Sequence, residues 1–217
     1  MSQDSILCII QARMGSTRLP GKIALPLLGK PMLWWDVYRV RKSRLLDNIV
    51  IATTSDVRDD PTAALCAEHG WLCYRGSEDD VLDRYYRAAC QFDASHIVRI
   101  TSDCPLIDAA VVDYVIAAYF SAAPAADYAS NVQQRSYPRG LDIEVFSFSA
   151  LETAWREDHS AWREHVTPFI YNTPAKFRLL SVSNPVDYSQ HRWTVDTPED
   201  FELVRRIYEH FGGGDFS

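Results

Sequence analysis

Short apolar runs alternate with amphipathic stretches along the first half of the chain, and the two patterns predict strands and helices in turn. The apolar runs, rich in Val, Ile and other strand-forming residues, predict strands at 6–10, 48–53, 71–74 and 96–100. The amphipathic stretches predict helices at 31–41, 60–70, 81–92 and from Asp108 onward. Strands and helices that alternate at this spacing predict an α/β fold with a mostly parallel sheet and helices on both faces.

Two helix starts carry a clear capping pattern. Ser77 and Asp80 have the spacing of a capping box in front of the helix predicted at 81–92. Residues 197–200, Thr-Pro-Glu-Asp, combine an N-cap, a proline at the first helical position and an acid at the third. They predict a last helix that begins there.

The regular alternation ends after residue 122. Residues 141–146 alternate polar and apolar side chains with period two, which predicts a strand with one polar face, typical of an antiparallel strand or a subunit edge. Further helices are predicted at 149–157 and 163–171, and further strands at 177–182 and 192–195. The length of 217 residues fits one domain, 1–217.

The composition of the chain limits the classes of partner and the cellular compartment that we expect for the protein. The formal charge of −7 argues against a nucleic acid or an anionic membrane as partner, because both attract a basic surface. No apolar run reaches the length of a membrane span, and the start does not resemble a signal peptide. The five cysteines include no C-x-x-C pair and lie in apolar contexts, so we expect buried free thiols in a reducing compartment. The prediction is a cytoplasmic protein.

A loop after the first predicted strand reverses the sign of the local charge. It carries Arg13, Arg18 and Lys22, and no acidic residue lies between Asp4 and Asp36. A glycine-bearing, cationic loop between a strand and a helix suits a polyphosphate, because the backbone N–H groups approach the anion closely. The glycine spacing fits neither a Walker loop nor the dinucleotide G-x-G-x-x-G motif. The loop therefore predicts phosphate binding without deciding the chemistry.

Two aspartates stand at the ends of predicted strands. Asp103 follows the strand at 96–100, and Asp196 follows the strand at 192–195. Ligands of open parallel sheets sit at the carboxyl ends of the strands, where two carboxylates and a substrate phosphate suit Mg²⁺. Each aspartate alone is as well explained by capping the turn into the next helix. Beside a phosphate loop, the metal becomes the better interpretation.

Several side chains near these strand ends keep two interpretations. Arg99 either faces a ligand or is a structural partner, and His165 lies either on a helix surface or in a catalytic site. His191 and Arg192 could reach the site or simply be solvated. Cys104 is better explained as a small buried or lining thiol than as a nucleophile, because no His partner stands out.

The charged residues of two further segments also have more than one interpretation. The acidic run at 75–80 is mostly explained by helix capping rather than by a metal. Arg139 precedes the alternating strand in which Asp142 and Glu144 share one face. That face fits a dimer edge and an acceptor site equally well.

The motifs of the chain resemble a known family. Residues 12–22, Ala-Arg-Met-Gly-Ser-Thr-Arg-Leu-Pro-Gly-Lys, are similar to the A-R-x-G-S-x-R-L-P-G-K signature of sugar-acid cytidylyltransferases, the CMP-Kdo and CMP-sialic acid synthetases. They are particularly similar to the SpsF-type relatives in spore-coat polysaccharide biosynthesis. The resemblance continues, in order, through 75–82, 99–107, 138–142, 163–167 and 194–200.

The resemblance implies a fold, a reaction and a cofactor. The fold would be the nucleotide-diphospho-sugar transferase (GT-A-like) fold, three α/β/α layers around a mostly parallel mixed sheet. CTP and a sugar acid would give a CMP-sugar and pyrophosphate for surface polysaccharide, with Mg²⁺ held by Asp103 and Asp196. The family's habit and the alternating strand suggest a homodimer, and residues 130–190 would contain the acceptor or dimerisation subregion.

The resemblance also implies a set of site residues. The groups implied as catalytic are Arg13, Lys22 and Asp103. Nucleotide binding is implied for Ala12, Arg13, Gly15, Ser16, Arg18, Lys22, Arg75 and Ser102. Acceptor binding is implied for Arg139, Glu144, Arg163 and His165.

The chain departs from the family pattern at two points, and other functions stay in view. Ser102 stands where the synthetases usually have Gly before the metal aspartate, and the chain is shorter than theirs. A glycosyltransferase on the same fold would normally need an Asp-x-Asp, which Ser102-Asp103-Cys104 does not supply. A nucleotide-binding subunit without turnover is the non-enzymatic alternative, and the shared presence of Arg13, Lys22, Asp103 and Asp196 argues against it.

Overall fold

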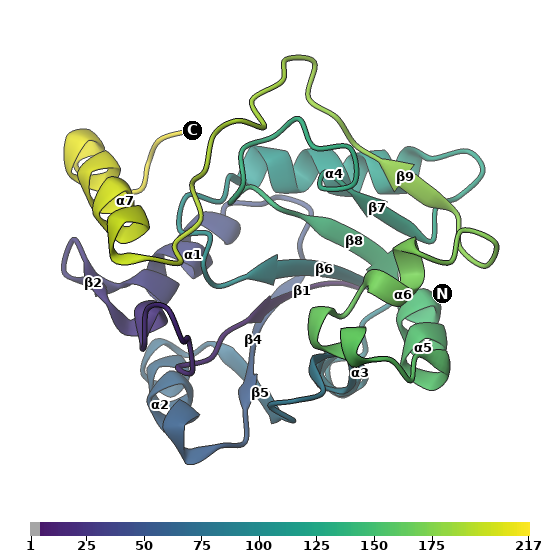
Figure 1. The fold of residues 1–217 in the computed structure, drawn as a ribbon, viewed down its shortest axis with the longest axis horizontal. Coiled ribbons are helices and arrows are strands. Elements are labelled where there is room, and N and C mark those ends of the chain that lie inside the picture. The colour runs from purple at the N-terminus through teal and green to yellow at the C-terminus, as the bar shows by residue number, and fades with distance from the viewer. Residues whose placement is uncertain (1–4) are drawn as a thin grey trace.

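A seven-stranded mixed sheet runs through the computed structural model, which describes residues 5–217 (Figure 1). The order across the sheet is β5-β4-β1-β6-β8-β7-β9. The strands are β1 (Ile6–Gln11), β4 (Asn48–Thr54), β5 (Leu72–Gly76), β6 (His96–Thr101), β7 (Tyr128–Ser130), β8 (Glu144–Ser147) and β9 (Leu179–Ser181). β5, β4, β1 and β6 are parallel, whereas β8 pairs antiparallel with both β6 and β7.

Helices cover both faces of the sheet (Figure 1). They are α1 (Met32–Val40), α2 (Asp60–His69), α3 (Val81–Gln91), α4 (Ala109–Ser121), α5 (Phe148–Glu157), α6 (Pro168–Tyr171) and α7 (Pro198–Phe211). Three 3-10 turns, η1 (Lys22–Ala24), η2 (Val57–Asp59) and η3 (Ala161–His165), and a small hairpin, β2 (Pro26–Leu27) with β3 (Lys30–Pro31), complete the chain.

Each face of the sheet has its own core. In β1, Cys8 and Ile10 point to the core shared with α1, α2 and α4, and Leu7 and Ile9 point to the core shared with α3, α5 and α6. A strand buried on both faces reads as one continuous apolar run, which is why β1 was recognisable in the sequence. The predicted α/β fold with three layers is confirmed. A third cluster packs α7 against α1 and the hairpin.

The predicted strand at 141–146 is right in its antiparallel pairing and wrong in its position. β8 starts at Glu144 and lies between β6 and β7, so it is not an edge strand. Its first three residues are all buried. The polar face expected from the alternation does not exist because the Glu144 carboxylate is paired inside the protein.

The helix predicted at 163–171 is interrupted. Val166 has a left-handed backbone (φ 69°, ψ −58°), which ends η3 at His165, and α6 then starts at Pro168. The amide of Thr167 donates to the carbonyl of His165 at 2.9 Å across Val166. This is the strained γ-turn, which is rare and costly for a β-branched residue.

The strand predicted at 192–195 is reduced to one bridge between Arg139 and Arg192. Gly140 explains the crossing: its φ is 105°, and a Cβ there would lie 2.7 Å from the carbonyl carbon of Trp193. Only glycine lets the two backbones approach so closely. Beyond the bridge, the Val195 amide donates to the carbonyl of Asp103 at 2.8 Å, so the segment crosses the end of β6 instead of joining the sheet.

Three smaller expectations also change. Ser77 Oγ accepts from the Asp80 amide at 3.0 Å, which is half of the predicted capping box. The N-cap of α3 is Asp80, which accepts from the Asp83 amide at 2.9 Å. The cysteines are free as predicted, but Cys73 is only partly buried and Cys90 is exposed. None of the helices found in residues 5–217 is long and apolar enough to cross a membrane.

Candidate active site

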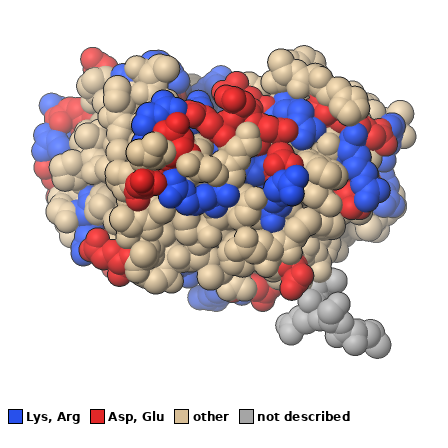
Figure 2. All heavy atoms as spheres, turned by 90° about the horizontal axis from the view of Figure 1, so that it is seen from below, with Lys and Arg blue, Asp and Glu red and all other residues tan. Residues whose placement is uncertain are grey.

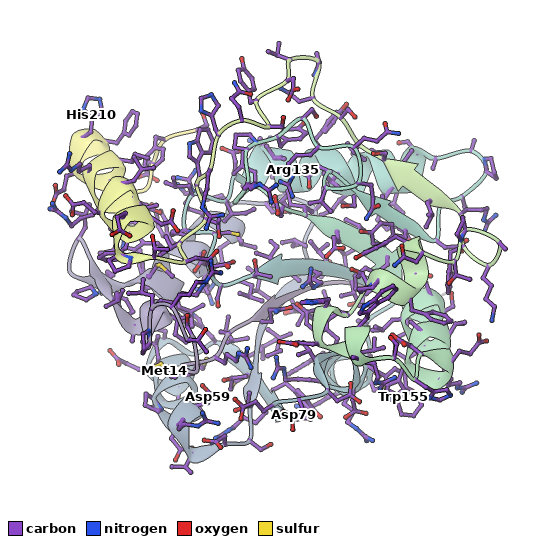
Figure 3. The ribbon with its side chains drawn as sticks, viewed as in Figure 1. Met14, Asp59, Asp79, Arg135, Trp155 and His210 are labelled. Atoms are coloured by element: carbon purple, nitrogen blue, oxygen red, sulfur yellow. The ribbon has the colours of Figure 1, made fainter. Side chains whose placement is uncertain are left out.

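The cationic loop, residues 12–22, leaves the carboxyl end of β1 and folds back on itself. The amides of Ser16 and Gly21 both donate to the carbonyl of Met14, at 2.9 and 3.0 Å. The Met14 amide donates to the Asp59 carboxylate at 2.6 Å, and both residues are labelled in Figure 3. Gly21 has a φ of 68°, which turns the chain directly into η1 at Lys22.

A cavity of about 260 Å³ lies inside this loop, and we call it the loop cavity. It is bounded by the ends of β1 and β6, the start of α3, and η3. Its lining residues are Gln11, Ala12, Arg13, Gly15, Ser16, Thr17, Arg18, Lys22, Val81, Arg84, Thr101, Ser102, Asp103, Glu164, His165 and Asp196. The structure thus brings together the residues predicted from the loop and from two distant strand ends.

Lys22 joins the three segments. Its ammonium group donates to Asp103 Oδ2 at 3.4 Å, to Asp196 Oδ1 at 3.1 Å and to the carbonyl of Val195 at 2.8 Å. Only 11% of its side chain is exposed. One buried cation is therefore shared by two carboxylates that lie far apart in the sequence.

Further cations crowd the second carboxylate. Arg18 contacts Asp196 Oδ1 at 3.1 Å and Arg192 donates to Asp196 Oδ2 at 2.8 Å. Burial alone would raise the pKa of Asp196, but the hydrogen bonds from Arg192 and Lys22 hold that pKa below its ordinary value. Asp196 is therefore an anion at neutral pH.

Arg13 and Arg84 both line the loop cavity. Arg13 is 42% exposed, with Glu78 and Glu164 each 3.8 Å away. Arg84 is buried, which lowers its pKa, and its Nε has no hydrogen-bond partner in the described part of the chain. Sequence reasoning missed Arg84, because an arginine inside a helical pattern looks like any solvated residue.

The structure leaves three of the predicted site residues outside both the loop cavity and the neighbouring cavity described below. Arg75 donates to the carbonyls of Thr54 and Asp56. Arg163 binds Asp80 and two backbone carbonyls near the end of α5. Arg139 forms the backbone bridge to Arg192 and is exposed. In this structure the first two side chains hold loops together.

A second cavity of about 510 Å³ lies next to the first, and we call it the strand cavity because β6 and β8 form its floor. Thr101 and His165 line both cavities. The other lining residues are Arg99, Val132, Gln133, Arg135, Asp142, Glu144, Thr167 and Tyr171. Glu144 and His165, both predicted for the acceptor, therefore meet here.

Two ion pairs line the strand cavity. Arg99 and Glu144 are register partners on β6 and β8, and their side chains are hydrogen-bonded. Arg135, labelled in Figure 3, donates two hydrogen bonds to the Asp142 carboxylate, of 2.6 and 3.0 Å. On the face drawn in Figure 2, acidic and basic side chains likewise lie next to one another rather than in separate patches.

Three residues surround the carboxylate of Asp103: Thr101, which is half-buried, and Cys104 and Asp36, which are buried. Thr101 donates to Asp103 Oδ1 at 2.5 Å. Burial and the neighbouring Asp103 raise the pKa of the Cys104 thiol, so the thiolate needed for nucleophilic attack is disfavoured. Asp36 on α1 is fully buried with neither oxygen hydrogen-bonded to any described residue, and burial followed by the charge of Asp103 raises its pKa.

The donor set is compatible with a divalent cation. No three His, Cys, Asp or Glu side chains among residues 5–217 are grouped closely enough to enclose a metal. Asp103 and Asp196, however, already share one cation, the Lys22 ammonium, so their oxygens are within reach of a common ion. Two carboxylates completed by water and phosphate oxygens is the arrangement that Mg²⁺ favours.

Comparison with known proteins agrees with this architecture. The chain is similar to a cytidylyltransferase of Leptospira borgpetersenii, with a TM-score of 0.94 and 36% identity over 99% of this chain and 91% of that one. It is 38% identical to the spore coat polysaccharide biosynthesis protein SpsF of Bacillus subtilis, over 96% of this chain and 88% of SpsF. A CTP complex of CMP:2-keto-3-deoxy-manno-octonic acid synthetase has the same fold, with a TM-score of 0.70 and 20% identity over 95% of this chain and 99% of that one.

The fold and the loop cavity define a nucleotidyltransferase. The family model described as cytidylyltransferase matches residues 7–211. The chain therefore belongs to the cytidylyltransferase family, as the motif at 12–22 predicted.

Proposed function

We propose that the protein transfers CMP from CTP to a hydroxyl group of a small sugar-acid-like acceptor, releasing pyrophosphate, for surface polysaccharide synthesis. One observation carries the proposal: Arg13, Arg18 and Lys22 on a single loop line one cavity together with the carboxylates Asp103 and Asp196. Cations and carboxylates arranged in this way suit a triphosphate with its metal. The family membership and the similarity to SpsF support the same reaction.

The chemistry needs positioning and charge neutralisation rather than a covalent intermediate. The acceptor oxygen forms a bond to the α-phosphorus while the bond from that phosphorus to the β-phosphate oxygen breaks, and the acceptor's proton is released. Arg13, Arg18 and Lys22 would stabilise the charge on the departing pyrophosphate. Ala12, Gly15, Ser16 and Ser102 line the same cavity and would position the nucleotide.

Mg²⁺ would be held by Asp103 and Asp196, and it would neutralise charge on the phosphate oxygens. When the triphosphate enters, Lys22 and Arg18 would exchange Asp196 for phosphate oxygens. That exchange would free carboxylate oxygens for the ion. The exposed position of Arg18 supports this exchange, since 63% of its side chain is accessible.

The reaction is tested by incubating the protein with each nucleoside triphosphate, a panel of sugar acids and Mg²⁺ while pyrophosphate is measured. We expect release with CTP and an acceptor together. Binding of CTP without a nucleotide adduct from any acceptor would contradict the transfer. The metal is tested with Asp103→Asn, which should abolish the Mg²⁺ dependence of CTP affinity. Asp93→Asn is the matched control, because Asp93 is exposed with a φ of 49°, which asparagine tolerates.

The homodimer and the cytoplasmic location stay predictions. The strand that suggested a subunit edge lies inside the sheet, so support for a dimer has to come from another surface. Tyr188 and Phe211 are exposed beside an apolar hollow of about 500 Å³, which is a candidate for that surface. A mass measurement in solution tests it.

A further inference from the structure

The strand cavity lies where an acceptor has to be if the proposed function holds, and the inference below rests on that function. Thr101 and His165 border both cavities, so a molecule that fills the strand cavity reaches the edge of the loop cavity. At about 510 Å³, the strand cavity has room for most of a sugar.

Glu144 is fully occupied by the protein. One carboxylate oxygen accepts from the hydroxyls of Tyr128 and Thr167, both at 2.6 Å, and the other accepts from Arg99. The side chain is 5% exposed. Burial alone would lower the pKa of Arg99, but the Glu144 carboxylate raises it, so this guanidinium stays charged and paired.

The second pair is more open to solvent, with 37% of the Asp142 side chain exposed. Arg135 and Asp142 meet through two parallel hydrogen bonds, the strongest geometry available to these groups. The hydrogen bonds that Arg135 donates to the Asp142 carboxylate raise the pKa of Arg135. The two cations and two carboxylates of the strand cavity therefore cancel.

The loop cavity differs because its cations have replaceable partners.

In a 2-ulosonic acid, the carboxylate and the reacting hydroxyl are attached to the same carbon atom. When that hydroxyl reaches the α-phosphate of CTP, the carboxylate therefore lies at the border between the two cavities, beside the phosphates. The part of the acceptor that enters the strand cavity is then its polyhydroxyl tail. Arg99 and Tyr171 are among the residues that line its path.

We propose that the strand cavity selects acceptors whose tail is uncharged, and that the Arg99–Glu144 and Arg135–Asp142 pairs set this selection by leaving no free cation for a second anionic group. A tail bearing a phosphate or a second carboxylate would meet guanidinium groups that already hold a protein carboxylate, and the Glu144 and Asp142 carboxylates would repel it. The specificity thus depends on ion pairing within the protein rather than on net charge.

The test uses two probes that differ only in the tail, 3-deoxy-manno-octulosonate and its 8-phosphate. Each is titrated into the CMP-loaded protein, and dissociation constants are measured by NMR. We expect the unphosphorylated probe to bind at least roughly tenfold more tightly. Equal or tighter binding of the 8-phosphate, or no binding of either probe, would overturn the inference.

Two variants separate charge pairing from simple damage. Asp142→Asn leaves Arg135 unpaired, so affinity for the 8-phosphate should rise by roughly tenfold and the preference should disappear. The double variant Arg135→Gln with Asp142→Asn removes both charges and should restore the preference of the unchanged protein. If the double variant behaves like Asp142→Asn alone, the pair does not set the selection.

A parallel titration distinguishes failure of this inference from failure of the proposed function. CTP is titrated in parallel, with Mg²⁺ and without an acceptor. Failure of CTP to bind contradicts the proposed function whatever the order of the probes. Normal CTP binding with a reversed probe order contradicts only the selection for an uncharged tail.

Discussion

The two neighbouring cavities hold their charged groups in different ways. In the loop cavity, Arg13 lies 3.8 Å from each of two acids, and Arg18 is mostly exposed. In the strand cavity, Glu144 receives three donors and Arg135 holds Asp142 through two hydrogen bonds. Loosely held cations can exchange a protein carboxylate for a phosphate, whereas locked pairs fix the strands that carry them. The charged groups of the loop cavity are therefore available to a substrate, whereas those of the strand cavity stabilise the fold.

The buried acids beside the two cavities show the same contrast. Glu144 lies in a complete set of hydrogen bonds, but Asp36 has none to either oxygen from the described residues. A charged group buried without partners is strongly unfavourable, so Asp36 is held in its neutral form by a raised pKa. The protein thus buries one carboxyl group with a complete set of partners and another without any among residues 5–217.

The largest effect should come from breaking the Arg99–Glu144 ion pair of the strand cavity. Glu144→Leu leaves the Arg99 guanidinium buried without its carboxylate, and removing one partner of such a pair costs about 3–5 kcal/mol of unfolding free energy. Urea unfolding followed by circular dichroism measures the loss. The double variant Arg99→Met with Glu144→Leu should recover most of it, because no charge is then left unpaired. A single variant as stable as the unchanged protein would show that the pair does not hold the strands.

Next in size is the loss of Lys22, the shared cation of the loop cavity. Lys22→Met should lower the rate of pyrophosphate release by about 10²–10³-fold, as expected when one preorganised charge facing the reacting phosphate is removed. Pyrophosphate release at saturating CTP gives the rate.

Lys30→Met is the matched control, since Lys30 is exposed and lies 5.5 Å above the Trp34 ring, away from both cavities. It should keep nearly full activity. Equal rates for the two variants would remove Lys22 from the mechanism.

The loop cavity was far more visible in the sequence than the strand cavity. Arg13, Arg18 and Lys22 lie within ten residues of one another in the chain. Asp103 follows a strand whose apolar run is easily recognised. The strand cavity depends on pairing between β6 and β8, which brings Arg99 to Glu144 across 45 residues. Period-two alternation at 141–146 could not reveal that a buried arginine on another strand neutralises the glutamate.

The second half of the fold was predicted less well for related reasons. β7 and β9 contain three residues each, too few for a periodic pattern, and β7 was missed altogether. The break at Val166 depends on a positive φ at a β-branched residue, which local propensity argues against. Tertiary contacts decided these segments, whereas propensity and burial on both faces decided β1, β4 and β6.

A smaller effect, of about 1–3 kcal/mol, is expected at Asp36. The folded pKa is raised above the unfolded value of 3.8, so its contribution to stability is present below that pH and is lost as pH rises toward the folded pKa. Asp36→Asn removes the titration. The variant should therefore gain stability relative to the unchanged protein between acid and neutral pH.

Urea unfolding at a series of pH values from 4 to 8 measures this difference. Asp93→Asn, a substitution of the same kind at an exposed position, is the control. Parallel profiles for the Asp36→Asn variant and the unchanged protein would mean that Asp36 is not held neutral, and the contrast with Glu144 would disappear.

The smallest effect on stability should come from Arg18, and it sharpens the comparison most directly. Its contact with Asp196 is mostly exposed, and exposed pairs contribute about 0–1 kcal/mol. Arg18→Gln should therefore unfold at nearly the same urea concentration as the unchanged protein. Its apparent affinity for CTP should fall by roughly tenfold, because the arginine exchanges Asp196 for a phosphate, and this loss should shrink at high salt. A variant that loses stability but keeps its CTP affinity would place Arg18 among the structural pairs, with those of the strand cavity.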